Sequence, residues 1–176
     1  MDYQSTRGGE RGVSPSLAIV KGLAADGGLF VPDSIPKLSK SLRELSELSY
    51  QDLAYEMMKL YLTDFTEEEL RFCIRSAYDD KFDCPEIAPV VKEGKFFYLE
   101  LFHGKTLAFK DMALSILPYL LKVSTRKNNI KEKIVILTAT SGDTGKAAME
   151  GFSDVEGTEI IVFYPKDGVS DFQERQ

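Results

Sequence analysis

Apolar residues recur every three to four positions through most of the first eighty residues, the spacing of helices with one buried face. Ser14 followed by Pro15 predicts a helix start, and Gly27–Gly28 is expected to end that helix. Thr66 and Glu69 form a capping-box pattern ahead of another helix. The further predicted helices cover residues 42–48, the stretch that follows residue 49, and residues 67–78. This part of the chain is predicted to be mainly helical, with its Met and Tyr stripes in the core.

The pattern changes after residue 85, where β-branched and aromatic runs alternate with helical ones. The prediction is a strand at 96–99, a helix at 107–123, a strand at 133–137, a loop at 138–142, a helix at 143–152 and a strand at 159–163. Strand, helix and strand at this spacing predict a parallel βαβ unit with a right-handed crossover. The fold class is therefore α/β, with a helical subdomain at 1–84 and the start of a sheet domain at 85–176. So few strands cannot form a sheet covered on both faces, so we expect a fragment of a longer protein.

Charge and composition exclude several classes of protein. A net charge of −6 and a pI near 5.0 argue against nucleic-acid binding, which needs a basic face. No apolar run approaches the roughly 20 residues of a membrane span, and the N-terminus lacks the apolar core of a secretory signal. The chain has two cysteines, Cys73 and Cys84, and the single histidine His103. This set does not fit a Cys/His zinc site, so no metal is predicted. Cys73 is expected to be a small buried hydrophobe, and a cytoplasmic location fits two such thiols.

Lys110 lies near the start of the predicted helix at 107–123, with Thr106 as the expected cap. A lysine there is unfavourably placed in the helix dipole, and desolvation would make its amine lose protons more readily, as an imine-forming lysine must. The alternative is a solvated lysine beside Asp111, which is the default for this residue type. His103 has the chemistry of a proton carrier, but a lone histidine in a glycine-containing loop is more often structural, and it receives no role.

Thr140–Gly145 brings hydroxyls, flexible backbone and free amides to a helix start, which suits a carboxylate or phosphate. A Walker loop is excluded because Gly145–Lys146 is followed by Ala147, and a dinucleotide fingerprint lacks one of its three glycines. A simple helix cap at Asp143 stays open as the default for an isolated Ser-Gly-Asp-Thr. The order and spacing of the lysine and of this loop indicate a pyridoxal phosphate enzyme that forms a Schiff base through lysine.

Four phrases of the sequence stand out together. They are Tyr3-x-Ser5-Thr6-Arg7-Gly8, the glycine-rich phrase at 22–32, the phrase at 106–111, and Thr140–Gly145. With them the chain resembles the N-terminal portion of the threonine synthase family, which belongs to the fold-type II pyridoxal phosphate enzymes. The phrase Thr-Leu-Ala-Phe-Lys-Asp is highly specific to this family. The resemblance implies the fold-type II architecture for the α/β domain.

The resemblance also implies roles for individual residues. Lys110 matches the lysine that carries pyridoxal phosphate covalently, and Asp143 the residue beside the cofactor. The residues that match the substrate-binding loop are Thr140, Ser141, Gly142 and Thr144. The sequence departs from many members at Asp143, where they have asparagine, and at Lys105, where they have proline. The loop that holds the cofactor phosphate belongs to the family's C-terminal half and has no counterpart here.

The implied reaction converts O-phospho-L-homoserine and water to L-threonine and phosphate, with Lys110 as base and acid at the α and β carbons. Two alternatives stay open: another fold-type II lyase, such as a threonine dehydratase or a phosphohomoserine lyase-like paralogue, and a truncated product without catalytic function. We expect the chain alone to be inactive and to hold no cofactor firmly. Its exposed apolar surfaces are expected to promote self-association.

Overall fold

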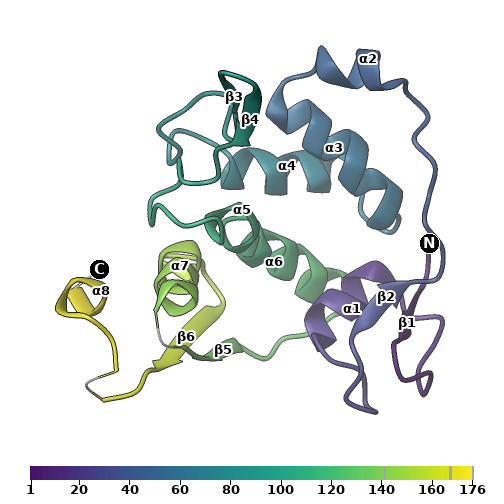
Figure 1. Cartoon of the computed structure of the whole chain (residues 1–176). Coiled ribbons are helices and arrows are strands. Elements are labelled where there is room, and N and C mark those ends of the chain that lie inside the picture. Colours follow the sequence, from purple (N-terminus) through teal and green to yellow (C-terminus); the bar gives the residue numbers. More distant parts are fainter. Residues whose placement is uncertain (141, 167, 176) are drawn as a thin grey trace. The chain divides into compact units, whose positions relative to one another are not determined.

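A computed structural model describes residues 1–140, 142–166 and 168–175 (Figure 1). The chain divides into two compact units. The first comprises Met1–Arg75 with Tyr119–Lys131, and the second comprises Ser76–Pro118 with the chain from Glu132 onward. The predicted domain boundary after residue 84 stays a prediction. No helix in the described parts of the chain is long and apolar enough to cross a membrane.

As far as it is described, the first unit contains two short strands and five helices. They are β1 (Tyr3–Ser5), α1 (Pro15–Lys21), β2 (Phe30–Pro32), α2 (Leu42–Ser46), α3 (Tyr50–Tyr61), most of α4 (Glu67–Ala77) and most of α6 (Leu117–Lys127). β1 pairs antiparallel with β2. The Asp26 carboxylate accepts from the Ser5 hydroxyl at 2.6 Å and from the Gly28 N–H at 2.9 Å. The two N-terminal phrases that carry the resemblance therefore hold each other in place. The hydrogen bond from Ser5 is the main cause that lowers the pKa of Asp26.

Three local predictions for this unit differ from the structure. α1 ends at Gly22 and not at the predicted Gly27–Gly28, because Gly22 adopts a φ of 67°, which glycine reaches without steric cost. The strand β1 was not predicted, since its antiparallel partner lies far along the sequence. Finally, α3 contains no fully buried residue and Met57 is 38% exposed, so the stripe that was expected in the core is only partly buried.

The core of the first unit lies where α4 and α6 (Leu117–Lys127) pack together. Leu70, Cys73 and Ile74 of α4 are almost completely buried. This confirms Cys73 as a buried hydrophobe, and burial raises the pKa of its thiol to about 12. Glu69 of α4 accepts from Lys127 of α6 at 3.0 Å. The helical stripe predicted for residues 67–78 is thus the stripe that builds this core.

The second unit begins with an antiparallel hairpin of β3 (Val90–Glu93) and β4 (Phe96–Leu99), of which β4 was predicted. The helix predicted at 107–123 is instead two helices, α5 (Asp111–Leu114) and α6. Pro118 explains the break, because it has no N–H to donate to the carbonyl of Leu114 four residues earlier. Lys110 consequently precedes a short helix and does not lie inside a long one.

The predicted βαβ unit is confirmed. β5 (Ile134–Ala139) and β6 (Thr158–Phe163) pair in parallel, with α7 (Asp143–Phe152) between them in sequence and α8 (Asp171–Arg175) following. β5 runs two residues beyond the predicted 133–137, so the loop that follows it is shorter than expected. α7 packs on one face of this strand pair (Figure 1). It also contacts α5, and Gly151 permits this because a side chain there would overlap the carbonyl oxygen of Leu114.

Candidate functional site

The segment Gly104–Lys110, here called the lysine loop, is closed by the first residue of α5. Asp111 is only 4% exposed. Its carboxylate accepts from the backbone N–H of Thr106 at 2.8 Å and from the Thr106 hydroxyl at 2.5 Å. Thr106 is therefore not the helix cap that the sequence predicted, because α5 starts only at Asp111 and the hydroxyl is bound to the carboxylate. The result is a loop held at both ends by one buried aspartate.

Two further features make the lysine loop tight. A methyl group on Gly104 would lie 2.6 Å from Cβ of Asp111, so only glycine fits at this close approach. Leu107 has a φ of 58°, in the left-handed region that non-glycine residues seldom adopt. Its side chain is 64% exposed. The loop thus holds a strained, apolar residue outward, and such strain is typical of functional segments.

Lys110 ends the lysine loop, directly before α5, and is half-buried. Its carbonyl accepts from the N–H of Leu114 at 2.9 Å, which fixes its backbone to the helix. Its Nζ lies 4.4 Å from the centroid of the Phe109 ring, a cation–π distance. The backbone under the candidate Schiff-base lysine is therefore well defined, while the amine rests on an apolar ring.

The loop after β5 is organised differently. The Thr140 hydroxyl accepts from the N–H of Gly142 at 3.1 Å, and Gly142 precedes α7 without a side-chain cap. Asp143 is the first residue of α7 and its side chain is 57% exposed, so the capping role left open for it is wrong. Thr144 follows it, half-buried. The predicted substrate residue Ser141 lies outside the described residues.

A cavity of about 440 Å³ brings the two segments together. Its lining residues are Thr106, Leu107, Ala108, Asp143, Lys146, Ser170 and Phe172. The lysine loop and the start of α7 thus share one space, with Lys110 two residues beyond Ala108. The predicted residues Thr140 and Gly142 line a smaller cavity of about 60 Å³. The structure therefore joins Asp143 to the lysine loop, and places Thr140 and Gly142 at a neighbouring hollow.

Lys146 lines both cavities and was not among the predicted site residues. Its Nζ lies 4.0 Å from Oδ1 of Asp143, one helical turn earlier, and its side chain is only 12% exposed. In the sequence this lysine serves only to exclude a Walker loop. Its position three residues after Asp143 was the available signal, because residues three apart share a helix face.

His103 and Lys105 are bound to carboxylates at the start of the lysine loop. The His103 ring lies 2.9 Å from Oε2 of Glu100 and 2.6 Å from Oδ1 of Asp83. These hydrogen bonds, the one with Glu100 first, raise the pKa of His103. Lys105 lies 3.0 Å from Glu150 of α7, a contact that raises the pKa of Lys105. Both residues anchor the loop, which agrees with the structural interpretation of His103.

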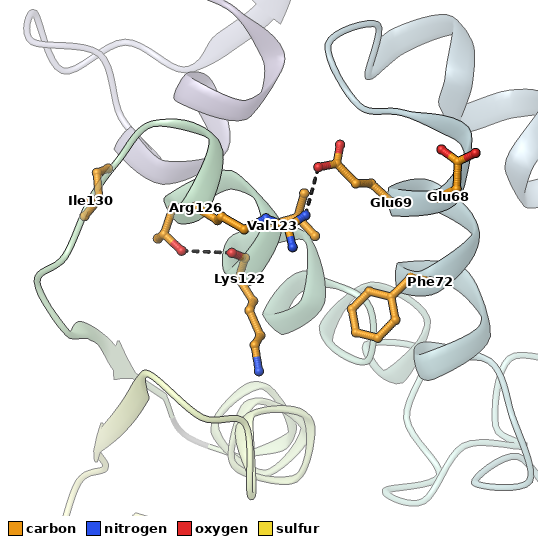
Figure 2. Close-up of a pocket in the computed structure, with 8 residues that line it drawn as sticks. Glu68, Glu69, Phe72, Lys122, Val123, Arg126 and Ile130 are labelled. Atoms are coloured by element: carbon orange, nitrogen blue, oxygen red, sulfur yellow. Dashed lines mark hydrogen bonds and ion pairs between the residues drawn. The ribbon is translucent and has the colours of Figure 1, made fainter.

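A larger cavity of about 540 Å³ lies between α4 and α6 and contains neither segment (Figure 2). Phe72 forms part of its wall, and Glu69 and Arg126 at its rim bind each other at 2.9 Å. Its lining offers no amine beside a strained loop and no helix start. Within 1–140, 142–166 and 168–175, no three His, Cys, Asp or Glu side chains group to hold a metal. The candidate site is therefore the smaller cavity beside the lysine loop.

Comparison with known proteins finds relatives along the whole chain. Residues 2–78 match the family model described as the threonine synthase N terminus. Over 190 aligned residues, 99% of the chain is 36% identical to threonine synthase of Saccharomyces cerevisiae. The chain resembles the N-terminal portion of threonine synthases. Threonine synthase-like 1 of Homo sapiens is 39% identical over 171 residues, covering 92% of this chain and 23% of that protein.

One portion of a solved threonine synthase has the same fold as this chain. The crystal structure of the pyridoxal phosphate-bound enzyme from Brucella melitensis superposes with a TM-score of 0.88 and 34% identity, covering 99% of this chain. This likeness confirms the predicted fold class of this chain, which is the α/β class of the threonine synthases. The chain spans 37% of the length of the yeast protein and 38% of the Brucella chain.

Proposed function

We propose that Lys110 carries pyridoxal phosphate in the complete protein. The residues present fit this group: a half-buried amine ends a tightly closed loop, and the loop borders a cavity of about 440 Å³. That volume lies in the range of small-molecule and cofactor sites. The relative from Brucella melitensis is described as bound to pyridoxal phosphate, which supports the proposal. When bound, the cofactor supplies an electron sink for the substrate.

The proposed roles of the chain's own residues follow from their positions. Asp111 and Thr106 hold the lysine loop, so that the Lys110 amine keeps its place. The amine would hold and move the proton at Cα and then at Cβ of the substrate. Asp143 would lie beside the cofactor. The substrate's carboxylate or phosphate is assigned to Thr140, Ser141, Gly142 and Thr144, at a helix start whose amides favour anions.

The reaction proposed for the complete protein is the conversion of O-phospho-L-homoserine and water to L-threonine and phosphate. The observation that carries it is the single cavity shared by Asp143 and the lysine loop, in a chain that resembles threonine synthases. The chain spans 37% of its yeast relative, so we assign the activity to the complete protein. We further propose that the isolated chain is inactive and binds the cofactor weakly.

Lys110→Ala in the complete protein tests the cofactor assignment. We expect loss of the visible absorbance of lysine-bound cofactor, and loss of the reduced adduct that borohydride traps on Lys110 in the parent protein. Lys105→Ala is the matched control, because Lys105 lies on the same loop as Lys110 and its side chain is 53% exposed. It should keep both signals. An adduct that maps to another lysine would refute the assignment.

Product analysis tests the reaction. Threonine and phosphate formed from O-phospho-L-homoserine support the synthase, whereas 2-oxobutyrate supports a fold-type II lyase. The isolated chain, assayed beside the complete protein, covers the third possibility of a product without catalytic function. Turnover by the isolated chain at the rate of the complete protein would contradict our assignment of the activity.

Self-association of the isolated chain is a separate proposal. One face of the β5–β6 pair exposes large apolar side chains, among them Leu137 at 66% and Phe163 at 60%. Contiguous apolar surface of this kind promotes association. Sedimentation at several protein concentrations should show a rising mass, and Leu137→Ser should reduce it. A constant monomer mass would remove this proposal.

A further inference from the structure

Lys146 occupies an unusual place for a lysine. Its side chain is 12% exposed, although lysine is a strongly hydrated residue that mostly stays in water. It lies in the first turn of α7, where the helix dipole disfavours a cation. It lines both the cavity of about 440 Å³ and the neighbouring one of about 60 Å³. A largely covered cation between two cavities is a feature that a bound anion would stabilise.

The surroundings of Lys146 fit an anion that is attached to a small organic body. In the cavity of about 440 Å³, Asp143 is the other charged lining residue. Its Oδ1 lies 4.0 Å from Nζ of Lys146, at the outer limit of an ion pair. An ammonium has three N–H donors, so a bound anion adds to this pair and does not require a vacant lysine. Leu107 and Phe172, 64% and 69% exposed, give the same cavity an apolar wall.

We propose that Lys146 is an anion-binding residue of this cavity and receives the phosphomonoester group of a phosphorylated ligand. A phosphate dianion binds a largely covered ammonium more strongly than a neutral polar group does, because a hydrogen bond between two charged groups is stronger than one between neutral groups. The identity of the ligand rests on the proposed function, in which the substrate and the cofactor both carry a phosphomonoester. The chemistry is shared by the two sources, and experiment can separate them.

Titration of the chain by NMR or calorimetry tests the proposal without any assay of activity. The probes are O-phospho-L-serine, inorganic phosphate and L-homoserine, which has no phosphate. Lys146→Ala should weaken O-phospho-L-serine binding about tenfold, the worth of one charge-assisted hydrogen bond, while Lys146→Arg stays close to the parent chain. Lys166→Ala, an exposed lysine of the same unit, is the matched control and should bind as the parent does.

Three results would overturn the anion site. They are equal affinity of the Lys146→Ala and parent chains for O-phospho-L-serine, an equal loss for L-homoserine, and no phosphate binding by the parent chain at about 10 mM. A urea midpoint equal to that of the parent shows that Lys146→Ala is folded. Comparing pyridoxal phosphate with pyridoxal then assigns the source. A loss confined to O-phospho-L-serine indicates the substrate phosphate, and a loss confined to pyridoxal phosphate indicates the cofactor phosphate.

The outcome is separable from that of the proposed function. Where the titrations assign the substrate phosphate, Lys146→Ala in the complete protein should raise KM for O-phospho-L-homoserine about tenfold and leave the absorbance of the Lys110-bound cofactor unchanged. If the complete protein makes no threonine but the chain still binds phosphate through Lys146, the function fails and the anion site stands. If threonine forms and the Lys146→Ala substitution leaves phosphate binding unchanged, the anion site is refuted and the proposed function stands.

Discussion

Three described helices of the second unit begin with aspartate, and in two of them, α5 and α7, this residue has opposite surroundings. Asp111 opens α5, is 4% exposed, and accepts two hydrogen bonds from Thr106. Asp143 opens α7, and its side chain is 57% exposed beside Lys146. The same residue type at the same helix position therefore accepts hydrogen bonds from a loop residue in one case and lines a cavity in the other. Burial decides which, because a buried carboxylate must have its partners inside the protein.

The two segments that these aspartates follow differ in the same way. The lysine loop is closed by Asp111 and anchored through His103, so its polar groups are mostly engaged within the loop and its neighbours. In the loop after β5, the described internal hydrogen bonds join Thr140 and Gly142. We infer that the lysine loop is built for rigidity. The start of α7 is suited to interaction with a ligand.

Removing each aspartate in turn should show the largest contrast. Asp111→Ala leaves the buried N–H and hydroxyl of Thr106 without acceptors, so we expect the free energy of unfolding to fall by about 3 kcal/mol. Asp143→Ala removes an exposed carboxylate, and the expected loss is within about 0.5 kcal/mol. Urea unfolding of both variants measures the difference.

Asp111→Asn sharpens this comparison, because the amide keeps one acceptor oxygen of similar shape. Its loss of unfolding free energy should lie between those of the two alanine variants. Equal losses for Asp111→Ala and Asp143→Ala would mean that the lysine loop is not held by its aspartate. The interpretation of Lys110 as a rigidly positioned amine would then lose its physical basis.

The packing of α7 on α5 brings the two regions together and should show the next largest effect. A methyl group at Gly151 would overlap the carbonyl oxygen of Leu114, so Gly151→Ala must push the helices apart. We expect the free energy of unfolding to fall by about 2 kcal/mol, the usual scale of overpacking. Thermal unfolding and the affinity for O-phospho-L-serine should both change, because the cavity between the two segments widens.

Glu150→Ala is the control for this experiment. Glu150 precedes Gly151 on α7, and its partly exposed ion pair with Lys105 is worth at most about 1 kcal/mol. A smaller loss than that of Gly151→Ala is therefore expected. If the two variants lose equal stability, the helix contact at Gly151 is looser than its geometry implies.

Local signals in the sequence predicted most helix starts correctly. The capping box of Thr66 and Glu69 is present, with both reciprocal hydrogen bonds, and the strand–helix–strand pattern gives the parallel pair of β5 and β6. These signals lie within a few residues of the elements that they specify. The resemblance to threonine synthases likewise came from short phrases, which the comparisons bear out.

The failures concern contacts between distant residues and competing signals. Pro118 was visible in the sequence, yet the apolar pattern continued through it and predicted one helix where there are two. The hydrogen bonds between Thr106 and Asp111 close a loop in which Leu107 has a positive φ. Residue propensities do not predict a positive φ for leucine. The cavity beside Lys146 forms only when α7, the lysine loop and the segment around residue 172 meet. Among the described residues that were predicted for the site, Asp143 lines one cavity together with the lysine loop.

The smallest predicted effect concerns the anchor that precedes the lysine loop. Hydrogen bonds with Glu100 and Asp83 raise the pKa of His103 above its unfolded value near 6.5. The folded state therefore binds this proton more tightly, and the stabilisation is complete below the unfolded pKa and is lost as the pH rises through the folded pKa. Unfolding free energies of the parent and of His103→Gln should therefore differ most below the unfolded pKa and converge as the pH rises through the folded pKa of the ring. Because His103 hydrogen-bonds at the surface, the difference should be smaller than that for Asp111→Ala. A difference between parent and variant that stays constant over this range would show that the ring acts only through its shape.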